Sequence, residues 1–320
     1  MIYLLLFVGF ALLIKGADYF VDGSANIAKL LRVPPLLVGL TIVAFGTGAP
    51  EATVSFIAAY EDSSDLTIGN VVGSNILNIA LVVGVTAIIF PLKVERATIK
   101  KEIPFTFLAS IVLLVLMSDQ YLQGTSINMI TRSDGIIFLL FFSIFLYYVF
   151  EAARNSRDKD FDEMTTDASI EQSWTRSLLK TVVGLGAIVF GGFLVVENST
   201  IIAYIFGLSE TLVGLTIVAI GGSLPELVIS VTAALKKQSE IALGNIVGSS
   251  IFNILFVLGV ASMITPLLVD YKIFFDASVM LMLTVLLFIF SKTKSTVGKL
   301  EGLALTIVYI SYLVYIIYRN

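Results

Sequence analysis

The sequence contains no cysteine and no histidine, and only 14% of its 320 residues are charged. Without cysteine, neither disulfide bonds nor thiolate metal sites are available to this chain. Without histidine, it lacks the most common side-chain base and transition-metal ligand. Any ion that the protein binds through its side chains must therefore be held mainly by oxygen.

Hydrophobic residues, by contrast, make up 57% of the chain. This fraction is too high for a soluble globular protein, whose surface must be largely polar. A membrane-spanning helix needs about 20 mostly apolar residues. The apolar runs are separated by glycine, proline or clusters of charge, and they divide into ten candidates. The ten expected spans are residues 2–31, 35–60, 66–90, 103–117, 135–153, 178–196, 208–235, 241–264, 274–290 and 302–318.

Two stretches of the first half return in the second half at a constant offset of 175 residues. VGLTIVAFGTGAPE at 38–51 returns as VGLTIVAIGGSLPE at 213–226, and GNVVGSNILNI at 69–79 returns as GNIVGSSIFNI at 244–254. The chain is thus internally duplicated, and a residue 175 positions after another is called its copy below. The copied positions include a glutamate within an apolar run, where an unpaired charge costs at least about 2.5–3.5 kcal/mol.

The basic residues predict the orientation of the chain in the membrane. Along a ten-helix path, 16 of the 20 lysine and arginine residues lie in loops on one side and three on the other. The basic side is expected to be cytoplasmic, so both termini should lie outside. Each half has five helices, an odd number, so the second half should be inverted. Two corresponding hairpin loops support this inversion. Residues 61–65 are acidic, as expected outside, whereas residues 236–240 begin with two lysines, as expected on the cytoplasmic side.

The expected fold is therefore an all-α, multi-pass protein of the cell membrane, with ten transmembrane helices in two inverted five-helix repeats. The first repeat covers residues 1–153 and the second covers 175–320. Between them, the polar stretch 154–174 has the composition of a solvated, cytoplasmic linker. The sequence indicates no nucleic-acid partner and no obligate protein partner.

A proline precedes each copied glutamate, and it predicts a broken helix. Pro50 has no N–H for the carbonyl of Gly46, so we expect helix 2 to break before Glu51, and helix 7 to break likewise before Glu226. Broken backbone at membrane depth is tolerated only inside protein or beside a water-filled cavity. Both carboxylates should thus lie beside free carbonyl oxygens in a buried, polar site.

In an inverted repeat the two breaks meet near the middle of the bilayer, so Glu51 and Glu226 should face each other. Two empty carboxylates would repel each other, and one would tend to take a proton. Calcium accepts about 6 to 8 oxygen ligands in a flexible cage, whereas magnesium keeps much of its water. Two bidentate glutamates, with carbonyls near Thr47 and Gly222 or with water, therefore predict a calcium site.

The second motif adds neutral oxygens on helices 3 and 8. Ser74 lies four residues before Asn78, and Ser249 lies four before Asn253, so each pair occupies one helical face. Hydroxyl, amide and carbonyl oxygens suit a monovalent hard ion such as sodium. The alternative for the two serines is a hydrogen bond at a helix contact, because small polar residues are common there.

With these residues, the chain resembles the calcium/cation antiporter superfamily, and more narrowly its prokaryotic sodium/calcium exchanger branch. The resemblance rests on GTGAPE with GNVVGSNILN in the first half and on GGSLPE with GNIVGSSIFN in the second. It implies an ion-binding core of helices 2, 3, 7 and 8, across which helices 1 and 6 move. It also implies that Glu51 and Glu226 hold calcium together with the carbonyls of Thr47 and Gly222.

The resemblance further implies two flanking sodium sites, one in each half. Gly48 and Gly222 stand where the family commonly has serine and threonine, so each site lacks one side-chain oxygen. Asn253 stands where the potassium-dependent branch typically has aspartate, which weakens the case for potassium transport. The implied ligands are the carbonyl of Ala44 with Thr47, Gly48 and Ser74, and the carbonyl of Ala219 with Gly222, Ser223 and Ser249.

The function that follows is secondary antiport rather than enzymatic catalysis. One calcium or several sodium ions would occupy the core in turn, and calcium would be exported by alternating access. Calcium and sodium are then transported substrates, and no cofactor is expected. Calcium/proton exchange through the same two glutamates is the alternative, since intramembrane carboxylates also relay protons. A cation channel fits an inverted repeat less well, and an intramembrane hydrolase would have to work without histidine or cysteine.

Overall fold

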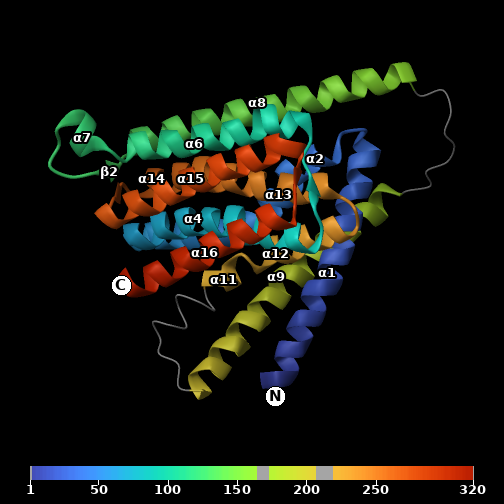
Figure 1. The fold of residues 1–320 in the computed structure, drawn as a ribbon, viewed down its shortest axis with the longest axis horizontal. Coiled ribbons are helices and arrows are strands. Elements are labelled where there is room, and N and C mark those ends of the chain that lie inside the picture. Colours follow the sequence, from blue (N-terminus) through green and yellow to red (C-terminus); the bar gives the residue numbers. More distant parts are fainter. Residues whose placement is uncertain (1, 164–172, 207–218, 320) are drawn as a thin grey trace.

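A computed structural model of the chain describes residues 2–163, 173–206 and 219–319, which are almost entirely helical (Figure 1). In the first half, the elements are α1 (Ile2–Leu31), α2 (Pro35–Val38), η1 (Gly39–Val43), α3 (Ala44–Tyr60), α4 (Ser64–Leu77), η2 (Asn78–Val82), α5 (Val83–Ile89), β1 (Leu92–Lys93), η3 (Thr98–Glu102), α6 (Ile103–Leu116), α7 (Asp119–Gln123), β2 (Met129–Ile130) and α8 (Arg132–Glu163). In the second half they are α9 (Trp174–Ile205), α11 (Ala219–Gly222), α12 (Leu224–Leu235), α13 (Ser239–Ile251), η5 (Phe252–Val257), α14 (Leu258–Ile264), β3 (Leu267–Leu268), α15 (Tyr271–Lys294), β4 (Thr296–Val297) and α16 (Lys299–Arg319). The segments labelled η are π-helical.

Eight helical segments of the described part of the chain are long and apolar enough to cross a membrane. They coincide with eight of the ten expected spans. The expected span 103–117 corresponds to α6, which has 14 residues and follows the charged segment η3. The expected span 208–235 is represented by α11 and α12, and its residues 208–218 lie outside the described residues. The chain is thus a multi-pass membrane protein.

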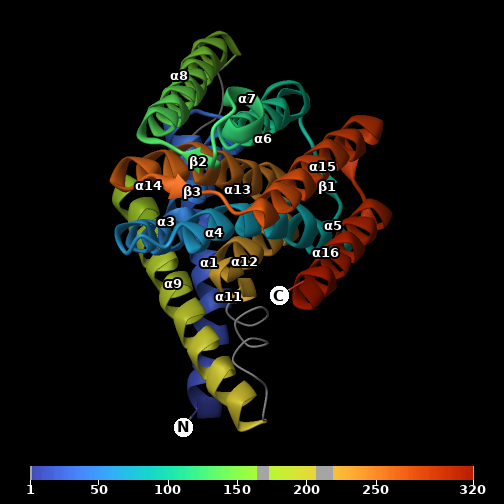
Figure 2. The same ribbon diagram turned by 90° about the vertical axis from the view of Figure 1, so that its left-hand side faces the viewer.

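The helices α4–α5 and α13–α14 form the centre of the molecule. In the span 239–264, 83% of the most apolar window is buried, compared with 17% in α16 and 22% in α8. Figures 1 and 2 show α8 and α16 on opposite outer sides of this centre. Most polar side chains in the described part of the two motifs are buried, including those of Glu51 and Glu226.

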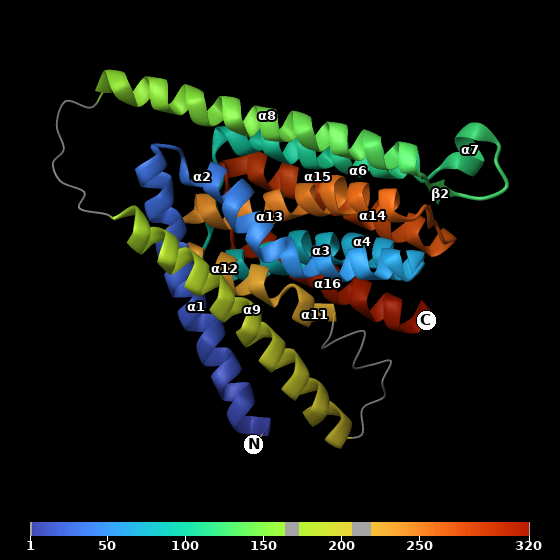
Figure 3. The same ribbon diagram turned by 180° about the vertical axis from the view of Figure 1, so that it is seen from behind.

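Helices α1 and α9 lie side by side and antiparallel, and they run obliquely to the other helices (Figures 1 and 3). Glycines let their backbones meet. A Cβ added at Gly16 would lie 2.9 Å from the carbonyl oxygen of Gly184, and one added at Gly9 would lie 3.0 Å from that of Gly191. Gly184 is the copy of Gly9, and Gly191 is the copy of Gly16. Each glycine therefore faces the copy of the other, in a close contact of the kind that small residues permit.

Two short antiparallel β-ladders also pair residues of one half with residues of the other. In the ladder of β1 with β4, Leu92 pairs with Val297, and in the ladder of β2 with β3, Leu267 pairs with Ile130. Leu267 is the copy of Leu92. Each ladder joins a strand of one half to a strand of the other, so the two halves are interlocked at both ladders.

The expected break in helix 2 before Glu51 is wrong. Helix α3 is continuous from Ala44 to Tyr60 with Pro50 inside it. Membrane helices tolerate proline when neighbouring groups and local adjustments satisfy the freed backbone, and the irregularity here is the π-helical segment η1, which ends just before Ala44. The expected break in helix 7 is present, because Ser223, with φ −100° and ψ 14°, separates α11 from α12.

Part of the expected linker, residues 154–174, is helical. Helix α8 continues to Glu163, and α9 begins at Trp174. The sequence of residues 154–163 contains neither glycine nor proline, so nothing local ends the helix once it has formed. Residues 164–172 of the expected linker lie outside the described residues.

Candidate ion-binding site

Two buried glutamates from different halves lie together in the core. Glu51 on α3 is 3% exposed and Glu226 on α12 is 0% exposed. Their carboxyl groups are close enough to interact directly with each other. Among the described residues, none of their four carboxylate oxygens accepts a hydrogen bond. A buried charge without a partner is costly, so this arrangement calls for protons or cations between the two side chains.

The backbone at Glu51 is held by an asparagine on the neighbouring helix α4. The Nδ2 group of Asn70 donates to the carbonyl oxygen of Glu51 at 3.1 Å and to Oγ of Ser55 at 3.0 Å. Ser55 lies one turn of α3 after Glu51. Asn70 therefore positions the helical turn from which the Glu51 carboxylate projects.

The second half builds the same arrangement and adds a contact to the first half. The Nδ2 group of Asn245 donates to the carbonyl oxygen of Glu226 at 3.5 Å and to Oγ of Ser230 at 3.2 Å. In addition, the hydroxyl of Thr47 donates to Oδ1 of Asn245 at 3.0 Å. Thr47 also lies near the Glu226 carboxyl group and 3.3 Å from the carbonyl oxygen of Ala44. These contacts join α3 of one half to α12 and α13 of the other.

A second cross-contact joins Ser74 to Asn253. The Nδ2 group of Asn253 donates to Oγ of Ser74 at 3.2 Å, while its buried Oδ1 atom has no partner among the described residues. A Cβ added at Gly48 would lie 3.6 Å from this Oδ1 atom and 3.0 Å from the ring of Phe252. The backbone at Gly48 therefore approaches a free amide oxygen, and a phenylalanine ring fills the space beside it.

The remaining predicted ligands form fewer hydrogen bonds than Thr47, Ser74 and Asn253. Asn78 and Ser249 are buried, and neither the amide of Asn78 nor the hydroxyl of Ser249 has a hydrogen-bond partner among the described residues. Ser223 is buried at the break of helix 7, and no atom of the described residues lies within 4 Å of a Cβ added at Gly222. Ala219 is the first residue of α11. Unpaired amide and hydroxyl oxygens are suitable ligands for a hard ion.

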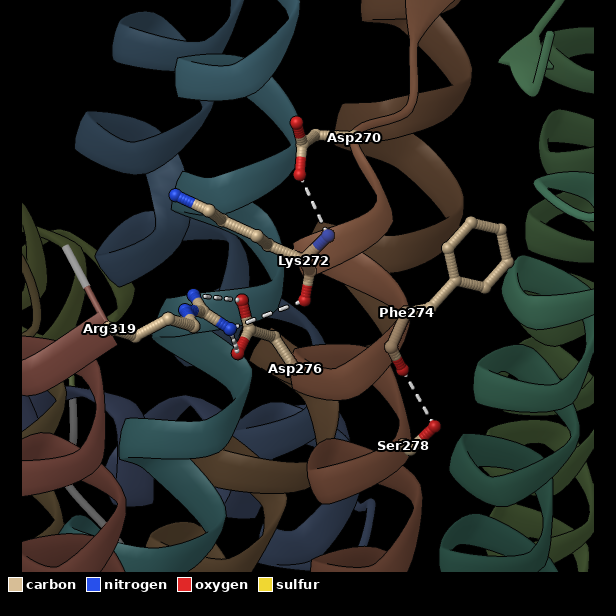
Figure 4. Close-up of polar contacts among 6 residues, drawn as sticks. All are labelled: Asp270, Lys272, Phe274, Asp276, Ser278 and Arg319. Carbon is tan, nitrogen blue, oxygen red and sulfur yellow. Dashed lines mark hydrogen bonds and ion pairs between the residues drawn. The ribbon is translucent and has the colours of Figure 1, made fainter.

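A cavity of about 850 Å³ lies beside the site and is lined by Glu51, Gly222 and Ser223. On its wall, Asp276 of α15 makes a two-pronged ion pair with Arg319 of α16, with both N–O distances 2.9 Å (Figure 4). This partner neutralises the Asp276 carboxylate, whereas no basic side chain of the described residues forms an ion pair with Glu51. The described residues contain no group of three or more acidic side chains that could hold a metal ion. A cation at this site would thus depend on the glutamate pair and on neutral oxygens.

The sequence interpretation did not select the two asparagines that hold the glutamate backbones, nor their serine partners. A signal was present, because Asn70 and its copy Asn245 stand inside the repeated motif. An amide in an apolar helix needs a definite partner, and Ser55 and Ser230 are also copies of each other. The offset alone could therefore have identified all four residues.

Comparisons with known proteins agree with these features. The family described as sodium/calcium exchanger protein matches residues 1–151 and 176–318. The chain is 38% identical over 314 residues to the putative antiporter CaxA of Alkalimonas amylolytica, covering 95% of each chain. It is 34% identical over 344 residues to the sodium/calcium exchanger MaX1 of Methanosarcina acetivorans, covering 99% of this chain and 98% of the relative.

A solved structure shares the fold over the whole chain. It is the sodium-calcium exchanger NCX_Mj, soaked with zero Na⁺ and Ca²⁺, with a TM-score of 0.82 and 30% sequence identity. The match covers 99% of this chain and 100% of that one. These relatives are transporters rather than enzymes, and the chain belongs to the sodium/calcium exchanger protein family.

Proposed function

We propose that this protein exchanges calcium for sodium across the cell membrane by alternating access, exporting calcium. The observation that carries the proposal is the pair of buried glutamates whose four carboxylate oxygens have no partner among the described residues. One divalent cation compensates both charges and supplies the missing contacts. The named exchange activity of MaX1 and NCX_Mj supports the same ions.

In this proposal the calcium ligands are Glu51 and Glu226 together with the carbonyl oxygens of Thr47 and Gly222. The amide oxygens of Asn78 and Asn253 face the same core as neutral groups. Two carboxylates and several neutral oxygens meet the preference of calcium for about 6 to 8 oxygen ligands. The unpaired oxygen of Asn253 and the unpaired amide of Asn78 support this assignment.

Sodium would bind on either side of the glutamates. The first sodium site would use Thr47, the Ala44 carbonyl, Gly48 and Ser74, and the contacts of Thr47 with Ala44 and of Ser74 with Asn253 support it. The proposed ligands of the second sodium site are the Ala219 carbonyl, Gly222, Ser223 and Ser249. Because the glutamates would serve both calcium and sodium, binding of one ion opposes binding of the other, and exchange follows.

The proposed architecture has ten transmembrane helices in two inverted repeats, residues 1–153 and 175–320. The exchanged glycine contacts of α1 with α9 and the exchanged strand ladders support it. In the proposed topology both termini lie outside and residues 154–174 lie in the cytoplasm, and the distribution of lysine and arginine among the loops supports it. In this arrangement α1 and α9 form the unit that moves across the core.

Calcium/proton exchange is the second candidate. The same unpaired carboxylates can hold protons, and glycine at positions 48 and 222 removes hydroxyl ligands that would favour sodium. Calcium uptake into vesicles containing the purified protein separates the two functions. We expect uptake to require sodium inside the vesicles and to continue when a proton ionophore removes any pH gradient. Uptake driven by an imposed pH gradient without sodium would favour the proton alternative.

A further inference from the structure

One lysine connects the pair α1–α9 to the helix that carries Glu226. The Nζ atom of Lys236, just after the end of α12, lies 2.8 Å from Oδ1 of Asp22 and 3.3 Å from Oδ1 of Asp18. It also donates to the carbonyl oxygen of Asp18 at 2.9 Å. Both aspartates belong to α1. The lysine thus bridges two carboxylates and one backbone carbonyl of α1.

The two helices that it joins have different positions relative to the site. Glu226 lies in the first turn of α12, and Lys236 caps the opposite end of the same helix. Helix α1 packs against α9 through backbone contacts at Gly9 and Gly16. The ion pairs therefore tie the α1–α9 unit to the core at one end of α12.

The repeat does not provide an equivalent tie on the other side. Lys236 is the copy of Glu61, and Glu197 is the copy of Asp22. Glu61 and Glu197 are both exposed and both acidic, so they cannot form an ion pair with each other. Within the described residues, no ion pair involves either of them. In a duplicated protein, this difference makes the two faces of the site unequal.

We infer that Lys236 is a positioning residue that holds α1 against α12 on the predicted cytoplasmic side only. The inference rests on the proposed alternating access. If α1 and α9 move across the core to open the cytoplasmic side, the contacts of Lys236 with Asp18 and Asp22 must break. The tie consequently favours the conformation in which the site is open to the outside.

The solvent exposure of the three side chains limits how strongly the ion pairs favour the outward-open conformation. The side chains of Lys236, Asp18 and Asp22 are 28%, 39% and 47% exposed, so water and salt screen the ion pairs. Partly exposed pairs of this kind shift an equilibrium by up to about 5-fold. The tie therefore adjusts the balance between the two conformations without locking one of them.

Cysteine labelling tests the inference directly, because the chain has no cysteine of its own. Val54 lines the cavity beside Glu51 and is 47% exposed. In the proposed topology it lies on the outer side of Glu51. In a Val54→Cys background, the rate of modification by a membrane-impermeant maleimide added outside reports the outward-open population.

We expect Lys236→Gln to lower the outside labelling rate by up to about 5-fold at low salt, with a smaller effect in 0.5 M salt. The neighbouring Lys237→Gln removes the same charge without touching α1 and should leave the rate unchanged. The exchanged pair Lys236→Asp with Asp22→Lys should restore part of the lost labelling. Glu61→Lys places a lysine at the position that corresponds to Lys236 on the predicted outer side. If this lysine pairs with Glu197, it should hold the outer side closed and lower the rate as well.

Equal labelling of Lys236→Gln and the parent, with equal thermal stability, would overturn the inference. A loss that the charge exchange does not restore would also overturn it, because pairing would then not be the cause. The labelling needs no transport, so these results are independent of the ions exchanged. Normal calcium/sodium exchange by Glu51→Gln would instead overturn the proposed function.

Discussion

The hydroxyl of Thr47 donates a hydrogen bond of 3.0 Å to Oδ1 of Asn245, although the two residues are 198 positions apart. Asn245 in turn donates its amide toward the carbonyl oxygen of Glu226. A single asparagine therefore links the helix of one proposed ligand, Glu51, to the helix of the other. At the copy of Thr47 stands Gly222, so the first-half asparagine, Asn70, receives no hydroxyl from that position.

Removing this hydroxyl should weaken both folding and ion binding. In Thr47→Val the side chain keeps its shape, but the buried Oδ1 atom of Asn245 loses its donor, which costs about 1–3 kcal/mol. Thermal unfolding should show the loss, and the sodium concentration for half-maximal exchange should rise. Thr47→Ser keeps the hydroxyl and serves as the control. Equal sodium dependence in the valine and serine variants would remove Thr47 from the proposed sodium site.

The missing hydroxyl at Gly222 can be restored because the position has room. Among the described residues, no atom lies within 4 Å of a Cβ added there, and the residue does not have a positive φ. In Gly222→Thr we expect a hydroxyl at the place that corresponds to Thr47, facing Asn70. A hydrogen bond of this kind contributes about 0.5–1.5 kcal/mol to the free energy of unfolding. The hydroxyl also supplies the side-chain oxygen that the second proposed sodium site lacks, so the sodium concentration for half-maximal exchange should fall. Gly222→Val has the same shape without the hydroxyl, and a gain shared by both variants would refute the explanation.

Adding a hydroxyl side chain at Gly48 should instead destabilise the protein, because the position has too little space. A Cβ there would lie 3.0 Å from the ring of Phe252, which stacks on Phe45 at 4.9 Å and on Phe256 at 5.0 Å between ring centroids. Overpacking of this kind costs about 1–3 kcal/mol, so Gly48→Ser should lower the melting temperature. Adding Phe252→Leu should recover part of the loss. If Gly48→Ser melts at the parent temperature, the aromatic stack is looser than its geometry indicates.

Neutralising one glutamate should affect the empty and the calcium-bound protein in opposite ways. Glu51→Gln keeps the size of the side chain and removes one of two adjacent buried charges. The ion-free protein should therefore melt at the same or a higher temperature. Removing one partner of a buried ionic contact costs about 3–5 kcal/mol, so calcium should bind about 10²- to 10⁴-fold more weakly.

Thermal unfolding with and without calcium measures both effects, because a ligand that binds only the folded state raises its stability. Glu226→Gln should behave in the same way if the glutamates share one ion. Leu66→Ala changes an exposed side chain on the same cavity wall and is the control for non-specific effects. Calcium stabilisation of Glu51→Gln equal to that of the parent would contradict the shared site.

How far the sequence predicts this protein differs from residue to residue. The burial of Glu51 and Glu226 was expected, because the cost of a charge in an apolar run depends only on local sequence. The effect of Pro50 was misjudged, because surrounding helices determine whether freed backbone groups find partners, and α3 remains continuous. The assignment of both glutamates and their neighbours as ion ligands stays a prediction until ions are bound and measured.

The sequence by itself determined the class of protein, the main membrane-spanning segments and the duplication that marks the two glutamates. Those properties depend on composition and on spacing along the chain. Only the tertiary structure decided which contacts the differing positions of the two copies make. Thr47 donates to Asn245, whereas no described atom lies within 4 Å of a Cβ added at Gly222. Phe252 fills the space beside Gly48, and Lys236 pairs with Asp22. These differences arise where helices from opposite halves approach each other, and such distances are set by packing rather than by the order of residues.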